Sequence, residues 1–471
     1  MSNDIIFKTF RTYRHPYVYD RHTNAIVMLT EDEFQELSRV ECGELPANQS
    51  IVIANHQEQG LFAPNVVESI DHYGAVLVKQ HMNTRLKQLI LQVTQQCNLR
   101  CSYCAYSGSY DSQRTHSNQR MQLETAKKAI DFFLGRNNEL ADVIIGFYGG
   151  EPLLEFDLIR HCVEYAKGQV EGKRLRFNMT TNGTLLSGDI AEYLVKNGFG
   201  LSISLDGSKD EHDANRKFAN GEGSFDTIMK NVRELRDRYP KYDGHISFMA
   251  TINPHIDLEC VMEYFSAEEV FSDTSIVFNN VNEAHLKGDL VYGQNYYGVR
   301  NYEYMKMLFA MVGKLDDKYV SPLVGRAKSA IEQKQRAVTS RMVLPSATHH
   351  GGPCLPGVQR LFVRTDGALF PCERVGEMLD FFVIGNLEDG FDIEKMKRVL
   401  NIGKLTEDEC KRCWGLRNCT ICASQVEFTG DMSKDEKIKE CPTSLNRAIS
   451  ELRELCVLNE FGLDVEGLMV Q

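Results

Sequence analysis

The decisive stretch of this chain is CNLRCSYC, residues 97–104, in which Cys97, Cys101 and Cys104 lie four and three residues apart. It follows an apolar segment at Leu86–Thr94 that predicts a β-strand. Three thiolates on one loop can hold three irons of a four-iron cluster and leave the fourth iron open. An open iron can bind a cofactor or a substrate, so the stretch predicts a redox site. A zinc site is the alternative, although zinc would require a fourth ligand.

A repeated strand–helix pattern extends from residue 85 to residue 285. Helical periodicity is clearest at 122–134 and 157–167. Six such units predict an α/β fold, a partial (βα)6 barrel similar to a TIM barrel, with the helices outside a parallel sheet. Active sites of such sheets lie at the carboxyl ends of the strands, which is where the cysteine loop begins. The expected strands are Leu86–Thr94, Val143–Tyr148, Leu175–Thr180, Leu201–Leu205, Ile246–Ile252 and Ser275–Val281.

An aromatic residue, Tyr103, directly precedes the last cysteine of the loop. With it the stretch resembles the CxxxCxxC signature of radical S-adenosylmethionine (SAM) enzymes. The resemblance implies that Cys97, Cys101 and Cys104 are the catalytic cysteines and the ligands of a [4Fe-4S] cluster, and that SAM is the cofactor. It implies that the reduced cluster cleaves SAM to methionine and a 5'-deoxyadenosyl radical, which removes hydrogen from a carbon.

Two further segments resemble motifs of the same enzymes. The sequence GGEP at 149–152 ends the second expected strand, and the resemblance implies that it receives the methionine amino group of SAM. The segment SLDGSKDEHDANR at 204–216 resembles a stretch whose serine and arginine bind the carboxylate or ribose of SAM. A guanidinium suits a carboxylate because it can form two parallel hydrogen bonds. The expected cofactor-binding residues are Tyr103, Gly149, Gly150, Glu151, Ser204 and Arg216.

A second group of cysteines lies between residues 354 and 441. Its spacing resembles the SPASM domain, an auxiliary-cluster module of radical SAM peptide maturases. One interval differs, because two residues separate Cys419 from Cys422 where the family usually has three. A zinc ribbon is the alternative, because two CxxC units would serve it. The metal-ligating cysteines expected here are Cys354, Cys372, Cys410, Cys413, Cys419, Cys422 and Cys441.

Seven cysteines are one short of the eight that two complete four-iron clusters need. The resemblance implies a closed cluster at Cys410, Cys413, Cys419 and Cys441, and a second cluster at Cys354, Cys372 and Cys422 with one free iron. The chain would then carry three [4Fe-4S] clusters. A free iron could bind a substrate thiolate and deprotonate it. In the rival interpretation Cys456 or a non-cysteine side chain fills the eighth position.

Residues 1–84 predict a small separate unit. Two strands at 17–19 and 25–29 enclose a turn, and Thr30 with Glu33 fits a helix capping box. We expect a third strand at Ile51–Ile53 and a helix around 66–70 that completes a winged-helix shape. The unit resembles the peptide-recognition element of peptide maturases, which implies that the leader of a precursor peptide adds a strand to the sheet edge at Ile51–Ile53. A structural cap on the barrel is the alternative.

The remaining regions are a helical bridge at 286–349 and a cysteine-rich SPASM domain at 350–471 with a final helix near 443–457. The formal net charge of −12 argues against a nucleic-acid partner. No apolar run approaches the ~20 residues of a membrane helix. The N-terminus, which starts Met1-Ser2-Asn3-Asp4, lacks the basic segment and apolar core of a signal peptide. We therefore expect a cytoplasmic protein whose fourteen cysteines serve as metal ligands, ten of them named above, or as free thiols rather than forming disulfides.

The resemblance as a whole implies a maturase similar to the sactipeptide and ranthipeptide enzymes. Such an enzyme would form Cys-to-carbon thioether crosslinks in a ribosomally made, cysteine-rich precursor peptide and take electrons from a flavodoxin- or ferredoxin-like donor. Formylglycine formation and carbon–carbon crosslinking are the enzymatic alternatives. A zinc-stapled peptide-binding adaptor without catalysis is the alternative from another class.

Overall fold

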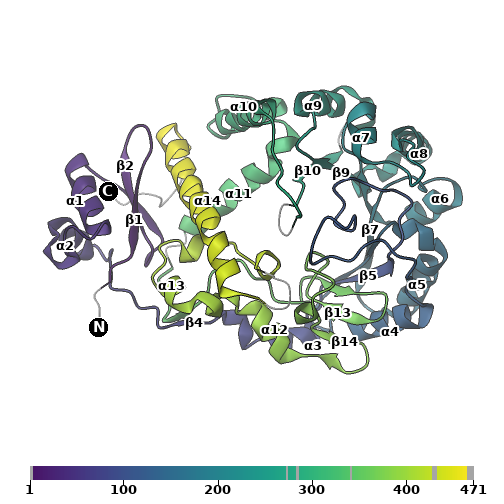
Figure 1. Ribbon diagram of the computed structural model, residues 1–471, viewed down its shortest axis with the longest axis horizontal. Helices are drawn as coiled ribbons and strands as arrows, with labels where there is room; N and C mark the ends of the chain where they lie inside the picture. The colour runs from purple at the N-terminus through teal and green to yellow at the C-terminus, as the bar shows by residue number, and fades with distance from the viewer. Residues whose placement is uncertain (1–3, 272–273, 283–285, 340–341, 427–431, 464–471) are drawn as a thin grey trace.

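The chain forms an arc of parallel strands, as expected. The computed structural model describes residues 4–271, 274–282, 286–339, 342–426 and 432–463. Figure 1 shows helices along the outside of the arc. All six expected strands are present, with ends within two residues of the prediction. They are β5 (Gln88–Thr94), β6 (Asp142–Gly149), β7 (Arg174–Thr181), β8 (Gly200–Ser204), β9 (Ile246–Ile252) and β10 (Ser275–Asn280).

The strand order of the sheet is β10-β9-β8-β7-β6-β5, in reverse sequence order and parallel throughout. This is the partial barrel predicted from the alternation. Apolar side chains of the strands pack against the outer helices in one core. These helices are α4 (Leu123–Leu134), α5 (Phe156–Gln169), α6 (Gly188–Lys196), α7 (Lys209–Asn215), α8 (Phe225–Arg238) and α9 (Leu258–Ala267).

The cysteine-rich region extends this sheet beyond β5. Strand β12 (Leu361–Val363) pairs in parallel with β5, and β13 (Ala368–Phe370), β14 (Gly385–Asn386) and β15 (Gly390–Phe391) follow in antiparallel order. The strand that leads into the first cysteine loop is therefore hydrogen-bonded to the region that carries the later cysteines. Helices α12 (Ile393–Leu400) and α13 (Glu407–Lys411) complete this region.

The N-terminal unit contains a three-stranded antiparallel sheet of β1 (Phe7–Arg11), β2 (Pro16–Asp20) and β3 (Ala25–Met28). The expected strands correspond to β2 and β3, whereas β1 was not predicted. Helix α1 (Glu31–Glu41) begins with the predicted capping box of Thr30 and Glu33.

Two expected elements of this unit are wrong. Residues Ile51–Ile53 form the first turn of helix α2 (Ile51–Gln57) and not a strand. Ser50 Oγ accepts a hydrogen bond from Ile53 N at 3.1 Å, and Glu36 of α1 accepts from Ser50 Oγ and Val52 N. This cap and tertiary contact outweigh the β-propensity of three branched residues. The proposed peptide-binding edge at Ile51–Ile53 therefore does not exist.

The helix expected around residues 66–70 is also wrong. This segment is extended and ends in β4 (Ser69–Ile70), which pairs in parallel with β11 (Ala347–Thr348). The Glu407 carboxylate accepts a hydrogen bond from Ile70 N. Instead, the next helix is α3 (Val78–Thr84), whose Val78 and Met82 belong to the barrel core.

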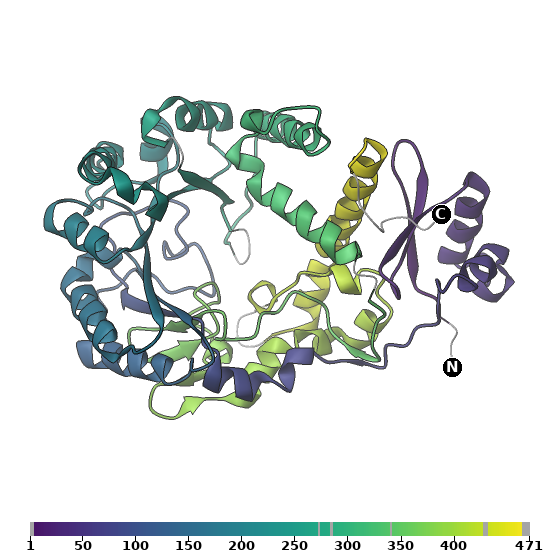
Figure 2. The same ribbon diagram turned by 180° about the vertical axis from the view of Figure 1, so that it is seen from behind.

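The two faces of the N-terminal sheet pack against different parts of the chain. Side chains alternate between the faces, as in any strand. Phe7, Val18 and Val27 face α1 and α2, whereas Tyr17 and Tyr19 pack against the bridge and the C-terminal helix. The bridge contains α10 (Gln294–Met311) and α11 (Gly325–Thr339). Figures 1 and 2 both show the sheet beside the C-terminal helix α14.

Helix α14 spans Lys434–Glu460 and is much longer than the predicted 443–457. Pro442 lies inside it. The longer helix carries Cys441. Within the described ranges, none of the helices is long and apolar enough to cross a membrane.

Candidate active site

The first cysteine loop lies at the carboxyl end of β5, as predicted. Two backbone hydrogen bonds join it to the end of α7 and the segment that follows. They run from Arg100 N to Lys217 O (2.7 Å) and from Ser102 N to Asn215 O (3.2 Å). The loop is therefore positioned from two sides of the barrel, by the strand that it follows and by the segment after β8.

The three thiols of this loop fit an iron–sulfur cluster. The pKa of Cys97 is raised to about 12 and that of Cys101 to about 11, mainly by burial and to a lesser extent by negative charge on the neighbouring cysteines. Amide groups donate to two sulfurs, from Leu99 N to Cys97 Sγ and from Tyr106 N to Cys104 Sγ, each at 3.4 Å. Such thiols ionise when a bound metal supplies positive charge.

Tyr103 and Arg216 meet beside this loop through Asp206. The Asp206 carboxylate accepts hydrogen bonds from Tyr103 OH and from Arg216 Nε (3.0 Å). One terminal nitrogen of Arg216 lies 4.0 Å from Cys101 Sγ and the other 3.4 Å from Thr251 Oγ1. Burial alone would lower the pKa of Arg216, but the charge of Asp206 raises it. The guanidinium is thus a buried, fixed positive charge next to the cysteine loop.

The two glycines of the GGEP segment allow β6 to approach the end of β5. A Cβ on Gly149 would lie 2.0 Å from Thr94 O, and Gly149 has φ +142°. A Cβ on Gly150 would lie 2.1 Å from Gln96 O. Any side chain at either position would push the cysteine loop away. These glycines therefore fix the distance between the GGEP segment and the loop.

Glu151 is buried, and its carboxylate joins the ends of β6 and β7. It accepts hydrogen bonds from Thr181 Oγ1 and Asn182 N, each at 2.7 Å, and from Leu153 N at 3.1 Å. Burial raises the pKa of Glu151 to about 7, against the effect of these donors. The carboxylate can therefore change protonation near neutral pH. Ser204 ends β8 and is half-buried.

The seven later cysteines separate into two groups. The pKa of Cys413 is raised to about 11, mainly by burial. Negative charge on Cys410, Cys419 and Cys441 contributes to this shift, so the three cysteines lie near Cys413. The same resemblance that implied a closed cluster put these four together. Cys372 behaves differently, because its pKa is raised to about 11 by burial and then by Glu373 and Cys422.

The segment that carries Cys354 runs against the segment that carries Cys422. A Cβ on Gly352 would lie 1.8 Å from Ile421 O, so the two backbones touch. Cys354 and Cys422 each follow this contact closely in sequence, and Cys354 is exposed. Among the described residues, no three His, Cys, Asp or Glu side chains converge closely enough to hold a single metal ion.

Cys456 lies in a different part of the molecule. It is buried on α14 among Leu452, Leu455 and the N-terminal sheet. It follows Cys441 by 15 residues on the same helix, which is about 22 Å along the axis. Its environment is that of a core thiol, and this speaks against Cys456 as the eighth ligand.

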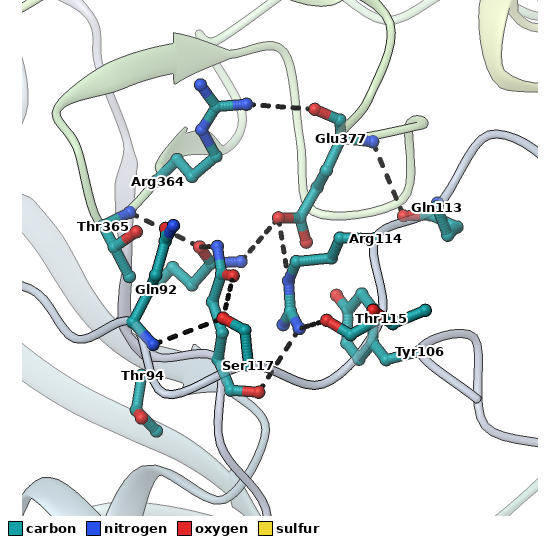
Figure 3. Close-up of polar contacts among 12 residues, drawn as sticks. Gln92, Thr94, Tyr106, Gln113, Arg114, Thr115, Ser117, Arg364, Thr365 and Glu377 are labelled. Atoms are coloured by element: carbon teal, nitrogen blue, oxygen red, sulfur yellow. Dashed lines mark hydrogen bonds and ion pairs between the residues drawn. The ribbon is translucent and has the colours of Figure 1, made fainter. Parts of the chain in front are cut away.

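A buried polar network links the first cysteine loop to the cysteine-rich region (Figure 3). The Glu377 carboxylate accepts hydrogen bonds from Arg114 Nε (3.1 Å) and from Gln92 Nε2 of β5 (2.7 Å). The side chains of Arg114 and Glu377 are only 5% and 2% exposed. Arg114 also donates to the backbone carbonyl of Gln95. Because Arg114 follows the first loop and Glu377 follows Cys372, the ion pair fixes the two regions relative to each other.

Tyr148 of β6 lies between the two cysteine regions. Its pKa is raised to about 12, mainly by burial and next by the charge of Glu373. A hydrogen bond with Tyr106 lowers this pKa, whereas the charge of Cys104 raises it. The Glu373 carboxylate pairs with Arg360 through one oxygen, while its other oxygen is buried with no partner in the structure. A carboxylate with a free oxygen at this place could accept a proton.

Sequence reasoning missed Arg114, Glu373 and Glu377. Their only signal in the sequence is proximity to the cysteine motifs. Arg114 and Glu377 are more than 260 residues apart, so their ion pair leaves no local pattern. Asp206 was visible in the segment after β8 and could have been chosen, since a buried arginine requires a counter-ion.

A cavity of about 700 Å³ lies between the N-terminal hairpin and the cysteine-rich region. Its lining includes Asn24 at the hairpin turn, Lys334 of α11, Thr420 beside Cys419, and Glu451 of α14. It is open to solvent and separate from the barrel.

Comparison with known proteins finds similarity to one group of enzymes. Residues 91–266 match the Radical SAM superfamily. The cysteine-type anaerobic sulfatase-maturating enzyme of Clostridium novyi is 26% identical over 344 residues, which cover 70% of this chain and 85% of that enzyme. An uncharacterized protein of Methanocaldococcus jannaschii is 38% identical over 151 residues, 32% of this chain and 49% of that protein.

Solved structures agree on the fold. Native anSMEcpe with bound AdoMet superimposes with a TM-score of 0.56 at 21% identity and covers 79% of this chain and 99% of that one. The same protein with bound AdoMet and the Cp18Cys peptide gives a TM-score of 0.56 at 22% identity, with 80% and 99% coverage. The predicted α/β partial barrel with a cysteine-rich C-terminal region is confirmed.

Proposed function

We propose that this chain is a radical SAM enzyme related to the anaerobic sulfatase-maturating enzymes. On that premise, it is a maturase that oxidises a residue of a peptide substrate. The observation that carries the proposal is the first cysteine loop, in which three half-buried cysteines lie beside the fixed charge of Arg216. Cys97, Cys101 and Cys104 would hold a [4Fe-4S] cluster. When bound, cluster and SAM supply a radical that removes a hydrogen atom from carbon.

The roles of this chain's own residues follow from their positions. Glu151 and the GGEP backbone would receive the SAM ammonium group, and Arg216 or Ser204 its carboxylate or ribose. Arg216 gives Nε to Asp206, and its terminal nitrogens contact Cys101 Sγ and Thr251 Oγ1. Each terminal nitrogen carries a second hydrogen that a ligand could accept. Tyr103, through Asp206, holds Arg216 in place and so acts on SAM indirectly.

Two oxidation products have specific support, and both begin with the same loss from a cysteine-containing peptide. One hydrogen atom, one proton and one electron leave the substrate in each case. If a second carbon receives the sulfur, a thioether forms. If water replaces the sulfur of an oxidised cysteine, formylglycine and hydrogen sulfide form. Glu373 is the carboxylate that we propose as proton acceptor, because one of its oxygens has no partner beside Tyr148.

Formylglycine formation is favoured by the relatives, since a cysteine-type sulfatase-maturating enzyme aligns with 70% of this chain. Thioether formation is favoured by the cysteine count of the C-terminal region. Cys354, Cys372 and Cys422 would leave one iron of an auxiliary cluster free for a substrate thiolate. Neither support depends on the other, so the product itself has to be identified.

The N-terminal sheet has no open edge for strand addition in the part of the chain that the structure describes. The edge of β1 is covered, because Glu41 accepts from Thr9 N and Arg453 donates to Arg11 O. At the other edge, Ala25, Ile26 and Val27 of β3 are at most 1% exposed, so that edge is covered as well. The leader of the peptide would therefore bind by a contact other than addition of a strand to this sheet.

Mass spectrometry of a cysteine-rich peptide after anaerobic incubation with SAM and a reductant tests the proposal. A thioether lacks two hydrogens, retains its sulfur and resists iodoacetamide. Formylglycine loses the sulfur and reacts with a hydrazide. We expect Glu373→Gln to form 5'-deoxyadenosine but much less product. Without 5'-deoxyadenosine from the wild type the enzymatic assignment fails, and a colourless, zinc-containing protein would support the adaptor instead.

A further inference from the structure

A fully buried lysine lies among the cysteines of the proposed closed cluster. Lys437, in the first turn of α14, is 1% exposed. Its Nζ donates to Thr406 Oγ1 at 2.5 Å and to Cys410 Sγ at 3.4 Å. Cys441 follows Lys437 by one helical turn, so both side chains lie on the same face of α14. The ammonium group therefore sits inside the cysteine group.

A buried ammonium group requires a negative partner, since an isolated buried charge is very costly. Within the described residues no carboxylate lies within ion-pair distance of Lys437. The Glu409 carboxylate, which feels the charge of Lys437, pairs with Lys434 at the surface at 2.6 Å. The negative partner must therefore come from the cysteines.

The neighbouring histidines add no further positive charge to the site. Burial is the main reason that the pKa of His349 is lowered to about 4 and that of His350 to about 2, and the charge of Lys437 contributes to both shifts. Both rings are therefore neutral at physiological pH. His349 is also fully engaged, because its Nε2 accepts from Gly403 N and its Nδ1 bonds His350 O.

We propose that Lys437 is the counter-ion of the auxiliary cluster at Cys410, Cys413, Cys419 and Cys441 and raises the reduction potential of that cluster. The inference rests on the proposed auxiliary cluster. Four thiolates make a four-iron cluster a net anion, and one-electron reduction adds a further negative charge. A cation in contact with a ligand sulfur stabilises the reduced form more than the oxidised form, and hydrogen bonds to sulfur act in the same direction.

This role would make the cluster a better electron acceptor than its ligands alone would. The proposed oxidation releases one electron from the substrate beyond the hydrogen atom and the proton. An auxiliary cluster of raised potential is suited to accept that electron. Lys437 acts only through the cluster, because its described ammonium contacts are to Thr406 and Cys410 and none reaches the buried network around Glu377.

Reductive titration of the reconstituted full-length protein tests the proposal. Lys437→Met removes the charge and keeps an unbranched side chain, and Lys439→Met is the matched control. Lys439 lies two residues further on the same helix, is 67% exposed and pairs with Glu436. The titration follows the paramagnetic signals of the reduced clusters in a Cys97, Cys101 and Cys104 to Ala background, which leaves only the auxiliary clusters.

We expect Lys437→Met to retain about eight irons, from two four-iron clusters, and to shift one reduction wave. At the midpoint potential of the unsubstituted protein, the ratio of reduced to oxidised cluster should fall roughly tenfold, a shift of about 59 mV for one electron. Lys439→Met should leave both waves in place. A full iron complement with both waves unmoved in Lys437→Met overturns the role of Lys437.

A second variant covers loss of the cluster. If Lys437→Met loses about four irons, Lys437→Arg, which keeps the charge, should retain them at an unchanged potential. Loss of the same irons in Lys437→Arg overturns the proposal, because shape rather than charge would then hold the site. A wild type with only about four irons refutes the auxiliary clusters themselves, a result distinct from an unmoved wave.

Discussion

Protonation of Glu151 should control SAM binding near neutral pH. Its pKa of about 7 results from burial, and the ammonium group of SAM would favour its carboxylate form. Below pH 7 a proton must leave before the ammonium can bind. We therefore expect the dissociation constant for SAM to rise as the pH falls, by about tenfold per pH unit below 7.

The same protonation also contributes to the free energy of unfolding. The size of this contribution follows from the difference between the ordinary glutamate pKa of 4.5 and the value of about 7. At about 1.4 kcal/mol per pKa unit, this difference corresponds to about 3.5 kcal/mol. In the SAM-free protein the native state holds the proton more tightly than the unfolded chain between these two values. The free energy of unfolding should therefore fall as the pH rises from 4.5 to 7, and bound SAM should offset part of that loss.

Equilibrium dialysis of SAM against anaerobic, oxidised, cluster-loaded protein measures this effect without turnover. We expect about tenfold weaker binding at about pH 6 than at about pH 8. Glu151→Gln should bind weakly at both pH values, whereas the control Glu155→Gln, on the next turn of the chain, should behave as wild type. A wild-type dissociation constant that stays constant over this range would refute the role of Glu151 as the ammonium acceptor.

Two further predictions concern the cysteine loop and the buried ion pair. Replacement of Cys97, Cys101 and Cys104 by Ala should abolish 5'-deoxyadenosine formation and lower the iron content from about twelve to about eight atoms, and continued formation of 5'-deoxyadenosine would contradict the assignment. Glu377→Gln should lower the free energy of unfolding by about 3–5 kcal/mol, because it leaves Arg114 buried and unpaired. The double variant Arg114→Met, Glu377→Leu should recover most of this loss in anaerobic urea unfolding, and strictly additive effects would show that the pair is not coupled.

The barrel could be predicted from the sequence because its signals are local and repeated. Each strand is an apolar run followed by a helix with one apolar side, as at Ile246–Ile252 and α9. Parallel order then follows from the alternation alone. The capping box at Thr30 was equally readable, because both of its partners lie within four residues.

Local signals failed where a distant contact decides the structure. At Ile51–Ile53 three branched residues favour a strand, but Glu36 of a preceding helix accepts the hydrogen bonds that start α2. The competing interaction comes from elsewhere in the chain, where periodicity carries no information.

The candidate site divides in the same way. Cysteine spacing and the resemblance that it carries select the candidate thiols of the three groups, and their role as cluster ligands stays a prediction. The charges around them could not be found from spacing. Lys437 precedes Cys441 by four residues and looks like one of several lysines at the start of α14.

The two kinds of charge around the cysteines suggest how the chain separates its redox tasks. At the first loop, the charge of Arg216 is already neutralised by Asp206, so the guanidinium adds little net positive charge to that site. At the later group, Lys437 has no carboxylate partner among the described residues and leaves its full charge to the sulfurs. A cluster at the first loop would then have the lower potential, as reductive cleavage of SAM requires, and the cluster beside Lys437 the higher one, as acceptance of an electron requires. The difference in potential is built from one buried carboxylate that is present at one site and missing at the other.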